Sequence, residues 1–167
     1  MMDYVVGLPL LAFAAVLQAT VLSLLRPFGG TVDVVLLLVL SWTLVGEWPG
    51  GPLWALIGGL CLDLLSGGPF GANALGLLLV AYAASLSEGR FWSSHVLLPL
   101  ASVLVGSVLY HLVYLATLAM AGYTVSWAAS LSQVTLPTVL LNTLFMLPLY
   151  QLLRWLHSVL HPATVRI

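Results

Sequence analysis

The sequence predicts an all-α integral membrane protein, a single domain in which about six transmembrane helices form one bundle. Of the 167 residues, 62% are hydrophobic and only 5% are charged, whereas soluble domains carry about 25% charged residues. The mean hydropathy is +1.14. Apolar stretches alternate along the chain with clusters of Gly, Pro and charge, which end helices. The surface must therefore be solvated mostly by lipid.

The amino-terminal half contains three expected spans, each bounded by helix-breaking residues. The first ends at a charged Pro-Gly turn, the second at a turn rich in Gly and Pro, and the third at a Gly-rich turn. The second and third are shorter than the about 20 residues that cross a bilayer. Flanking residues, a locally thinner bilayer or partial re-entry would accommodate them. The expected spans are 4–25, 31–45 and 53–65.

The carboxy-terminal half contains three more expected spans. The fourth is short and ends before a segment that contains Glu88 and Arg90. The fifth and sixth are long, and the sixth includes Pro137 and Pro148. Five spans are the chief alternative to six. The expected ranges are 72–86, 93–121 and 127–155.

The arginines suggest an orientation for the bundle. Six spans place both termini on one side of the membrane. That side would carry Arg90, Arg154 and Arg166, and the opposite side would carry Arg26. Because cationic residues are retained in the cytoplasm, we expect both termini to be cytoplasmic.

Composition argues against several classes of function. The chain has no lysine, so it lacks a phosphate-binding loop of the GxxxxGK[ST] type. A net charge of −1 with four dispersed arginines provides no basic surface for nucleic acid. The lone Cys61 has neither a disulfide partner nor zinc-site neighbours. His157 and His161 have helical spacing but lack further ligands, so we expect neither a metal nor another cofactor.

Asp63 lies inside the third expected span. A carboxylate there costs about 2.5–3.5 kcal/mol and normally has a partner. Either Arg26 or the backbone amides of the Gly-rich turn that follows could supply it. We favour this structural role over an ion or proton site formed with Asp33. Asp33 is expected to meet the dipole at the start of the second helix, and Asn73 to cap the fourth.

Small residues recur at four-residue spacing on several expected helices. Such pairs place small side chains on one helical face and allow neighbouring backbones to approach closely in a membrane. We favour packing within the bundle, with docking of another protein's helix as the alternative. The pairs are Ala15 with Ala19, Ala55 with Gly59, Ala72 with Gly76, and Ser102 with Gly106.

A second polar layer is expected deeper in the bundle. Gln18, His111 and Asn142 fall at similar depth on the first, fifth and sixth spans. We interpret them as a hydrogen-bonded layer that fixes helix rotation. A proton relay through His111 is the alternative, and we disfavour it because both Asp33 and Asp63 are expected at the outer rim, away from His111. The same separation leaves no catalytic set, so we expect no enzyme.

The acidic motif and its turn resemble a known family. Residues 59–67, GLCLDLLSG, and 69–75, PFGANAL, resemble the central signature of the rod shape-determining MreD family. Residues 32–38 fit the start of that family's second helix, although Val32 stands where proline is frequent. The positions that match the motif or begin this helix are Asp33, Gly59, Asp63, Gly67, Pro69, Gly71 and Asn73.

This resemblance implies a non-enzymatic scaffold of the cell-elongation machinery in the bacterial inner membrane. It implies binding to the single-span protein MreC, and direct or indirect association with MreB and the RodA–penicillin-binding protein synthase. The scaffold would help to regulate side-wall peptidoglycan synthesis and rod shape. It also implies a fold similar to the substrate-binding subunits of energy-coupling-factor transporters. The alternative is a transporter subunit that binds a small molecule or lipid in a polar pocket near Asp33 and Asp63.

Overall fold

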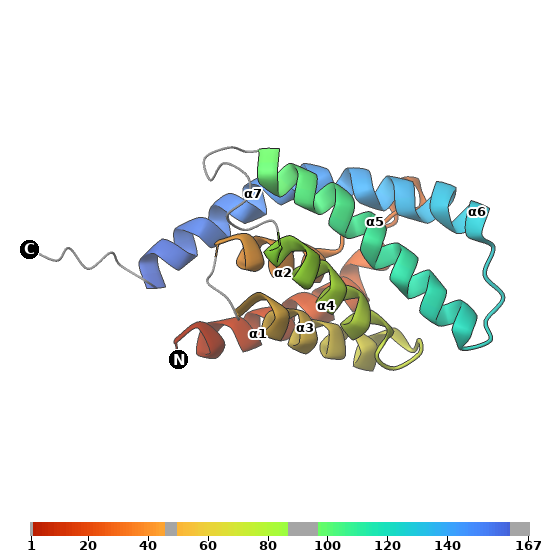
Figure 1. Ribbon diagram of the computed structural model, residues 1–167, viewed down its shortest axis with the longest axis horizontal. Coiled ribbons are helices and arrows are strands. Elements are labelled where there is room, and N and C mark those ends of the chain that lie inside the picture. Colours follow the sequence, from red (N-terminus) through yellow and green to blue (C-terminus); the bar gives the residue numbers. More distant parts are fainter. Residues whose placement is uncertain (1, 46–49, 87–96, 161–167) are drawn as a thin grey trace, which may run out of the picture.

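The computed structural model describes residues 2–45, 50–86 and 97–160, and every regular element within these ranges is helical (Figure 1). Six helical rods are present there, which confirms the prediction of an all-α chain. The first and last rods each contain a π-helical segment. The elements are α1 (Met2–Leu17) with η1 (Gln18–Leu22), the turn η2 (Pro27–Gly29), α2 (Val34–Val45), α3 (Gly50–Ser66), α4 (Ala72–Ser85), α5 (Leu97–Met120), and α6 (Trp127–Ser130), η3 (Leu131–Thr135) and α7 (Leu136–Leu160).

The rods differ greatly in length. Two of those described, Leu97–Met120 and Trp127–Val159, are long and apolar enough to cross a membrane. The other four are apolar but shorter, and α2 has 12 residues, which corresponds to about 18 Å at 1.5 Å per residue. Residues 93–96 of the expected fifth span lie outside the described residues, as do Arg90 and Arg166.

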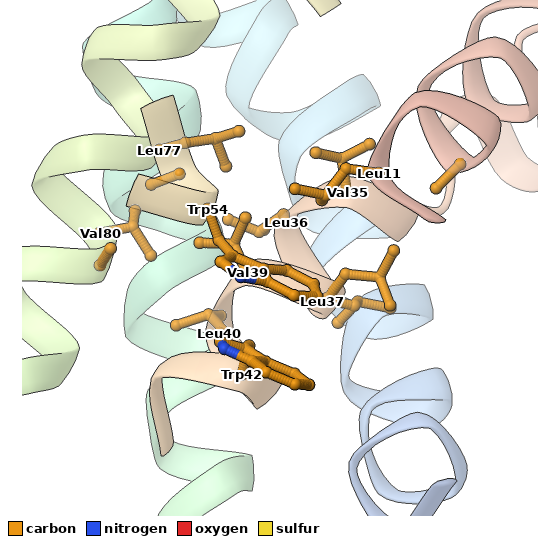
Figure 2. Close-up of a cluster of buried hydrophobic side chains, with 14 of the residues drawn as sticks. Leu11, Val35, Leu36, Leu37, Val39, Leu40, Trp42, Trp54, Leu77 and Val80 are labelled. Carbon is orange, nitrogen blue, oxygen red and sulfur yellow. The ribbon is translucent and has the colours of Figure 1, made fainter. Parts of the chain in front are cut away.

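Helix α2 forms the centre of the bundle. Its residues from Val35 to Thr43 are all buried, and it contacts α1, α3, α4, α5 and α7. A helix that is apolar on every side must be enclosed by other apolar groups, and this sequence meets that requirement with an unbroken hydrophobic run. Figure 2 shows the resulting core, in which Trp42 stacks on Trp54 with ring centroids 4.2 Å apart.

Close packing of α3 against α4 explains one of the predicted small-residue pairs. A Cβ at Gly59 would lie only 2.7 Å from the backbone nitrogen of Ala74, so no larger residue fits there. Ala55, one turn earlier, is fully buried. The turn between the helices uses left-handed backbone at Gly67 and Gly71, with φ of +65° and +92°, which glycine adopts readily.

The other small residues pack within the bundle as well. A Cβ at Gly76 would meet the Tyr110 ring at 2.8 Å, and Gly106 fits between Leu40 and Val80. Ala15 is fully buried, whereas Ala19 is partly exposed. Internal packing, the interpretation favoured from sequence, therefore accounts for Gly59, Gly76 and Gly106.

A loop rests on the π-helical turn of the last rod. Pro137 has no backbone N–H, and the π-helical turn η3 ends just before it, at Thr135. A Cβ at Gly29 would lie 2.5 Å from the carbonyl oxygen of Gln133, and one at Gly30 would lie 2.6 Å from the nitrogen of Thr138. The two glycines thus bring the backbone of the loop after η1 directly against residues 133–138 of the last rod, and the chain then turns inward to α2.

Candidate functional site

Asp63 is buried at the end of α3, where four N–H groups surround its carboxylate. Oδ1 accepts the backbone N–H of Asn73 at 2.9 Å and the side-chain Nδ2 of the same residue at 3.0 Å. Oδ2 accepts the N–H groups of Gly71 at 3.0 Å and Ala74 at 3.2 Å. The side chain therefore has its charge satisfied within the protein, at 4% exposure of the residue.

This arrangement caps α4 from a neighbouring helix. The first N–H groups of a helix have no partner within it, and Gly71, which precedes α4, has no side chain to supply one. Asp63 takes that role. The expectation that Asn73 caps α4 is therefore wrong, because Asn73 lies inside the first turn of α4 and its side chain points to Asp63.

The partner of Asp63 matches one of the two structural alternatives. The backbone amides of the turn and of α4 bind it, as the second alternative expects. Arg26 instead donates from Nε to the carbonyl oxygen of Ser23 at 3.0 Å. Among the residues described, Asp63 has no ion pair with Arg26 or any other cation. The amides suffice because an ionised carboxylate accepts N–H bonds strongly.

Asn73 connects this cap to α5. Tyr110 donates its hydroxyl hydrogen to Asn73 Oδ1 at 2.5 Å, and the Asn73 amide lies 3.4 Å from Ser66 Oγ. Because Asn73 Nδ2 donates and Oδ1 accepts, the amide has only one orientation that fits both partners. The residues of the Asp63 cluster thus tie α3, α4 and α5 together.

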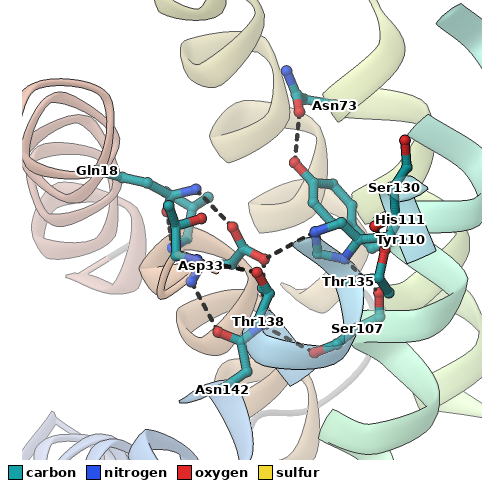
Figure 3. A network of polar contacts seen from close by, with 12 residues as sticks. Gln18, Asp33, Asn73, Ser107, Tyr110, His111, Ser130, Thr135, Thr138 and Asn142 are labelled. Atoms are coloured by element: carbon teal, nitrogen blue, oxygen red, sulfur yellow. Dashed lines mark hydrogen bonds and ion pairs between the residues drawn. The ribbon is translucent and has the colours of Figure 1, made fainter. Parts of the chain in front are cut away.

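A second cluster surrounds Asp33, just before α2 (Figure 3). The chain from Gly30 to Asp33 is neither helix nor strand, so its amides need partners elsewhere. Side chains from other helices provide them at alternate residues. Thr31 donates to Thr138 Oγ1 at 3.1 Å, Asp33 to Asn142 Oδ1 at 2.9 Å, and Val35, in α2, to Gln18 Oε1 at 3.0 Å.

The Asp33 carboxylate faces the same helices. Gln18 Nε2 lies 3.3 Å from Oδ1, and Asn142 Nδ2 lies 3.3 Å from Oδ2. His111 Nε2 lies 3.8 Å from Oδ2, which makes Asp33 and His111 the one ion pair found in the described part of the chain. The structure therefore brings Gln18, His111 and Asn142 together around a shared acid.

This geometry corrects three expectations. Asp33 is not at an exposed rim, since the residue is only 6% exposed, and an acid does lie beside His111. The sequence places the helix start at residue 31, but α2 begins at Val34. The preceding residues bring the chain back into the bundle, so Asp33 reaches the depth of the polar layer.

Two members of the Asp33 cluster were not identified from the sequence. Ser107 accepts Asn142 Nδ2 at its hydroxyl oxygen, 3.1 Å away, and its backbone carbonyl lies 2.9 Å from His111 Nδ1. Thr138 accepts the N–H of Thr31. Isolated hydroxyl residues in apolar helices have no distinguishing pattern, although Ser107 does lie one turn before His111.

The two clusters have limited chemistry. Within the described residues, no three His, Cys, Asp or Glu side chains gather where they could hold a metal ion. All four donors to Asp63 are backbone or amide N–H groups, which do not titrate. Asp33 and His111 are the two ionisable side chains in contact in this cluster.

Comparison with protein families matches residues 1–159 to the rod shape-determining protein MreD. No curated protein and no solved structure matches the chain, so the expected likeness to energy-coupling-factor subunits stays a prediction. The matched region includes both acidic clusters and extends into the last turn of α7. Proteins of this family are membrane-associated, determine rod shape and associate with the rod-complex machinery. Because the match covers nearly the whole length, the chain belongs to the MreD family of rod shape-determining proteins.

Proposed function

We propose that this protein is a non-enzymatic scaffold of the cell-elongation machinery, embedded in the bacterial inner membrane by six spans. It binds MreC and, directly or through MreC, associates with MreB and the RodA–penicillin-binding protein synthase, so that it helps to regulate side-wall peptidoglycan synthesis. One observation carries the proposal: groups of the protein's own helices bind both buried carboxylates. Asp63 caps α4, and Asp33 holds side chains from η1, α5 and α7.

The same observation favours a scaffold over a transporter subunit that binds a ligand near these acids. A ligand would need free polar groups to recognise. Four protein N–H groups already contact the Asp63 oxygens, and two amides contact those of Asp33. Polar atoms here hold helices in register, which suits a protein that presents a fixed surface to others.

The exposed surface supports membrane insertion. Large apolar side chains project outward along the long rods, for example Val105 on α5 and Leu140 and Leu144 on α7. Lipid tails or apolar partner helices would cover such a surface in the cell. Both termini would be cytoplasmic, and the loop from Ala121 to Ser126 would face outward.

Cysteine labelling tests this topology. In a Cys61→Ser background, Tyr123→Cys should react in intact cells with a maleimide that cannot cross the membrane, because Tyr123 is exposed in the outer loop. Ser158→Cys, at the exposed end of α7, should react only after the cells are permeabilised. Labelling of both positions in intact cells would contradict an even number of spans.

Co-purification tests the scaffold. We expect detergent-solubilised, tagged protein to retain MreC through several washes. Leu140→Trp and Val105→Trp alter exposed faces of α7 and α5 without entering the core. If the docking surface includes one of these faces, that variant should lose MreC while keeping its thermal stability. Failure of the wild-type protein to retain any MreC, with both proteins present in the membrane, would overturn the proposal.

A further inference from the structure

The Asp33–His111 contact joins two ionisable side chains inside the bundle. His111 Nε2 lies 3.8 Å from Asp33 Oδ2, and the two side chains are 13% and 8% exposed. The other buried acid, Asp63, has only backbone and amide N–H partners. The Asp33–His111 contact therefore differs from the Asp63 cap, because in it both the acid and its partner are ionisable.

The protonation of the His111 ring follows from its other contact. Its Nδ1 lies 2.9 Å from the backbone carbonyl oxygen of Ser107. A carbonyl oxygen can only accept, so Nδ1 must carry the hydrogen of that bond. In a neutral ring Nε2 would then present a lone pair to the Asp33 carboxylate. The lone pair and the carboxylate repel each other, so the contact is favourable only when a proton lies between Nε2 and Oδ2.

The amides around Asp33 cannot take the place of that proton. Gln18 Oε1 accepts the N–H of Val35 and Asn142 Oδ1 accepts that of Asp33, so both amide groups have a fixed orientation. Each then directs its NH₂ group at the carboxylate. These donors do not titrate, which leaves His111 as the exchangeable donor.

The segments around this contact contain few other ionisable groups, and most of these have partners of their own. Residues 17–25, α2 and residues 127–148 contain no ionisable side chain at all. Tyr110 and Tyr114 are the other ionisable residues of α5 near His111, and Tyr110 donates its hydroxyl hydrogen to Asn73. Asp63 on α3 is held by its four N–H donors, and the exposed Arg26 bonds to Ser23.

We propose that His111 and Asp33 form a proton-binding site, which takes up one proton from water and holds it on Nε2 facing Oδ2. With the proton bound, the pair is an imidazolium and a carboxylate with no net charge, which a low-dielectric interior tolerates better than an unpaired ion. Release of the proton would weaken the connection of α5 to the segment before α2. That segment also contacts η1 through Gln18 and the start of α7 through Thr138.

Nitrogen NMR on the full chain in nanodiscs tests the site. The protein is labelled with ¹⁵N in its histidine rings, and the signals that His111→Gln removes are those of His111. In wild-type protein we expect the His111 ring to carry protons on both nitrogens over a certain pH range. Over that same range, the His111 ring in the Asp33→Asn variant should carry only the Nδ1 proton. His157→Gln, a change at the other end of the bundle, should leave the His111 signals in place.

Thermal stability provides a second measurement. The ion pair contributes only while the proton is bound, so its contribution is present at lower pH and lost as the pH rises through proton release. Wild-type protein should lose stability over the same pH range in which its Nε2 proton disappears, and His111→Gln should lack that step. Should Asp33→Asn fail to fold, the wild-type spectrum still decides. A neutral ring with its proton on Nε2, or a stability profile unchanged by His111→Gln, would overturn the site.

Discussion

A carboxylate at position 63 is stable in an apolar bundle because it replaces a missing part of another helix. Gly71 gives the turn its left-handed backbone but no capping side chain. Asp63 reaches across from α3 and accepts the orphan N–H groups of α4. The spacing of Asp63, Gly67, Gly71 and Asn73 in the motif therefore has a mechanical explanation, in which the acid and the glycines serve one turn.

Substitution of Asp63 tests this explanation. We expect Asp63→Leu to lower the free energy of unfolding by several kcal/mol, because each buried donor left without a partner costs about 1–3 kcal/mol. Asp63→Asn should cost about half as much, because it keeps one oxygen that can accept two of the four bonds. Thermal unfolding in detergent measures both. Equal, severe loss of cell-shape function in the two variants at normal protein levels would instead indicate a requirement for the charge itself.

For single residues, the sequence identified most of the polar side chains of the two clusters but not which of them contact one another. Gln18, His111 and Asn142 could be recognised as polar residues at matching depth. Their shared partner Asp33 could not, because its hydrogen bonds to Asn142 join residues 109 positions apart. A local pattern contains no information about such a contact.

Among the elements, the α3–α4 pair depends on backbone contact more than on side-chain fit. Gly59 faces the backbone of Ala74 with no room for a Cβ. Helices that approach this closely gain dispersion contacts over their whole crossing, which matters in lipid because burial of apolar surface provides little driving force there.

Gly59→Leu should therefore separate α3 from α4 and destabilise the protein strongly, by more than the about 1–3 kcal/mol typical of overpacking, because backbone atoms cannot move aside. Ala83→Leu introduces the same side chain at an exposed position of α4 and serves as the matched control. Size-exclusion profiles and thermal unfolding in detergent should show loss of folded protein for the first variant alone. Similar stability of the two variants would contradict the packing argument.

Helix identity was predictable from hydrophobicity, whereas one helix start was not. Thr31 and Val32 continue the apolar run of α2, so composition alone extends the span to residue 31. The structure leaves them non-helical because Thr138 and Asn142, on a distant helix, accept the amides that a helix start would leave unpaired. Pro137 was visible in the sequence, but the π-helical turn η3 that precedes it, and the loop that packs there, depend on tertiary contacts.

For the molecule as a whole, α2 depends on parts of the chain that lie far along the sequence. It is enclosed by helices from both halves, and its first residues bond to α7. Expression of residues 1–126 alone should give protein that aggregates in detergent, because α6–α7 is missing. Co-expression with residues 127–167 should restore a monodisperse complex. Stable folding of the first fragment alone, measured by size exclusion and thermal unfolding, would contradict this dependence.

The position of Asp33 also sets an order of events during biosynthesis. When the ribosome has completed α2, neither Asn142 nor His111, which lies 78 residues after Asp33, has yet been made. Of its side-chain partners only Gln18 precedes it, and an acid that entered a bilayer without the others would stay near water or near the insertion machinery. In a bundle that spans the membrane as proposed, α2 would therefore reach its final depth only after the last rod is translated.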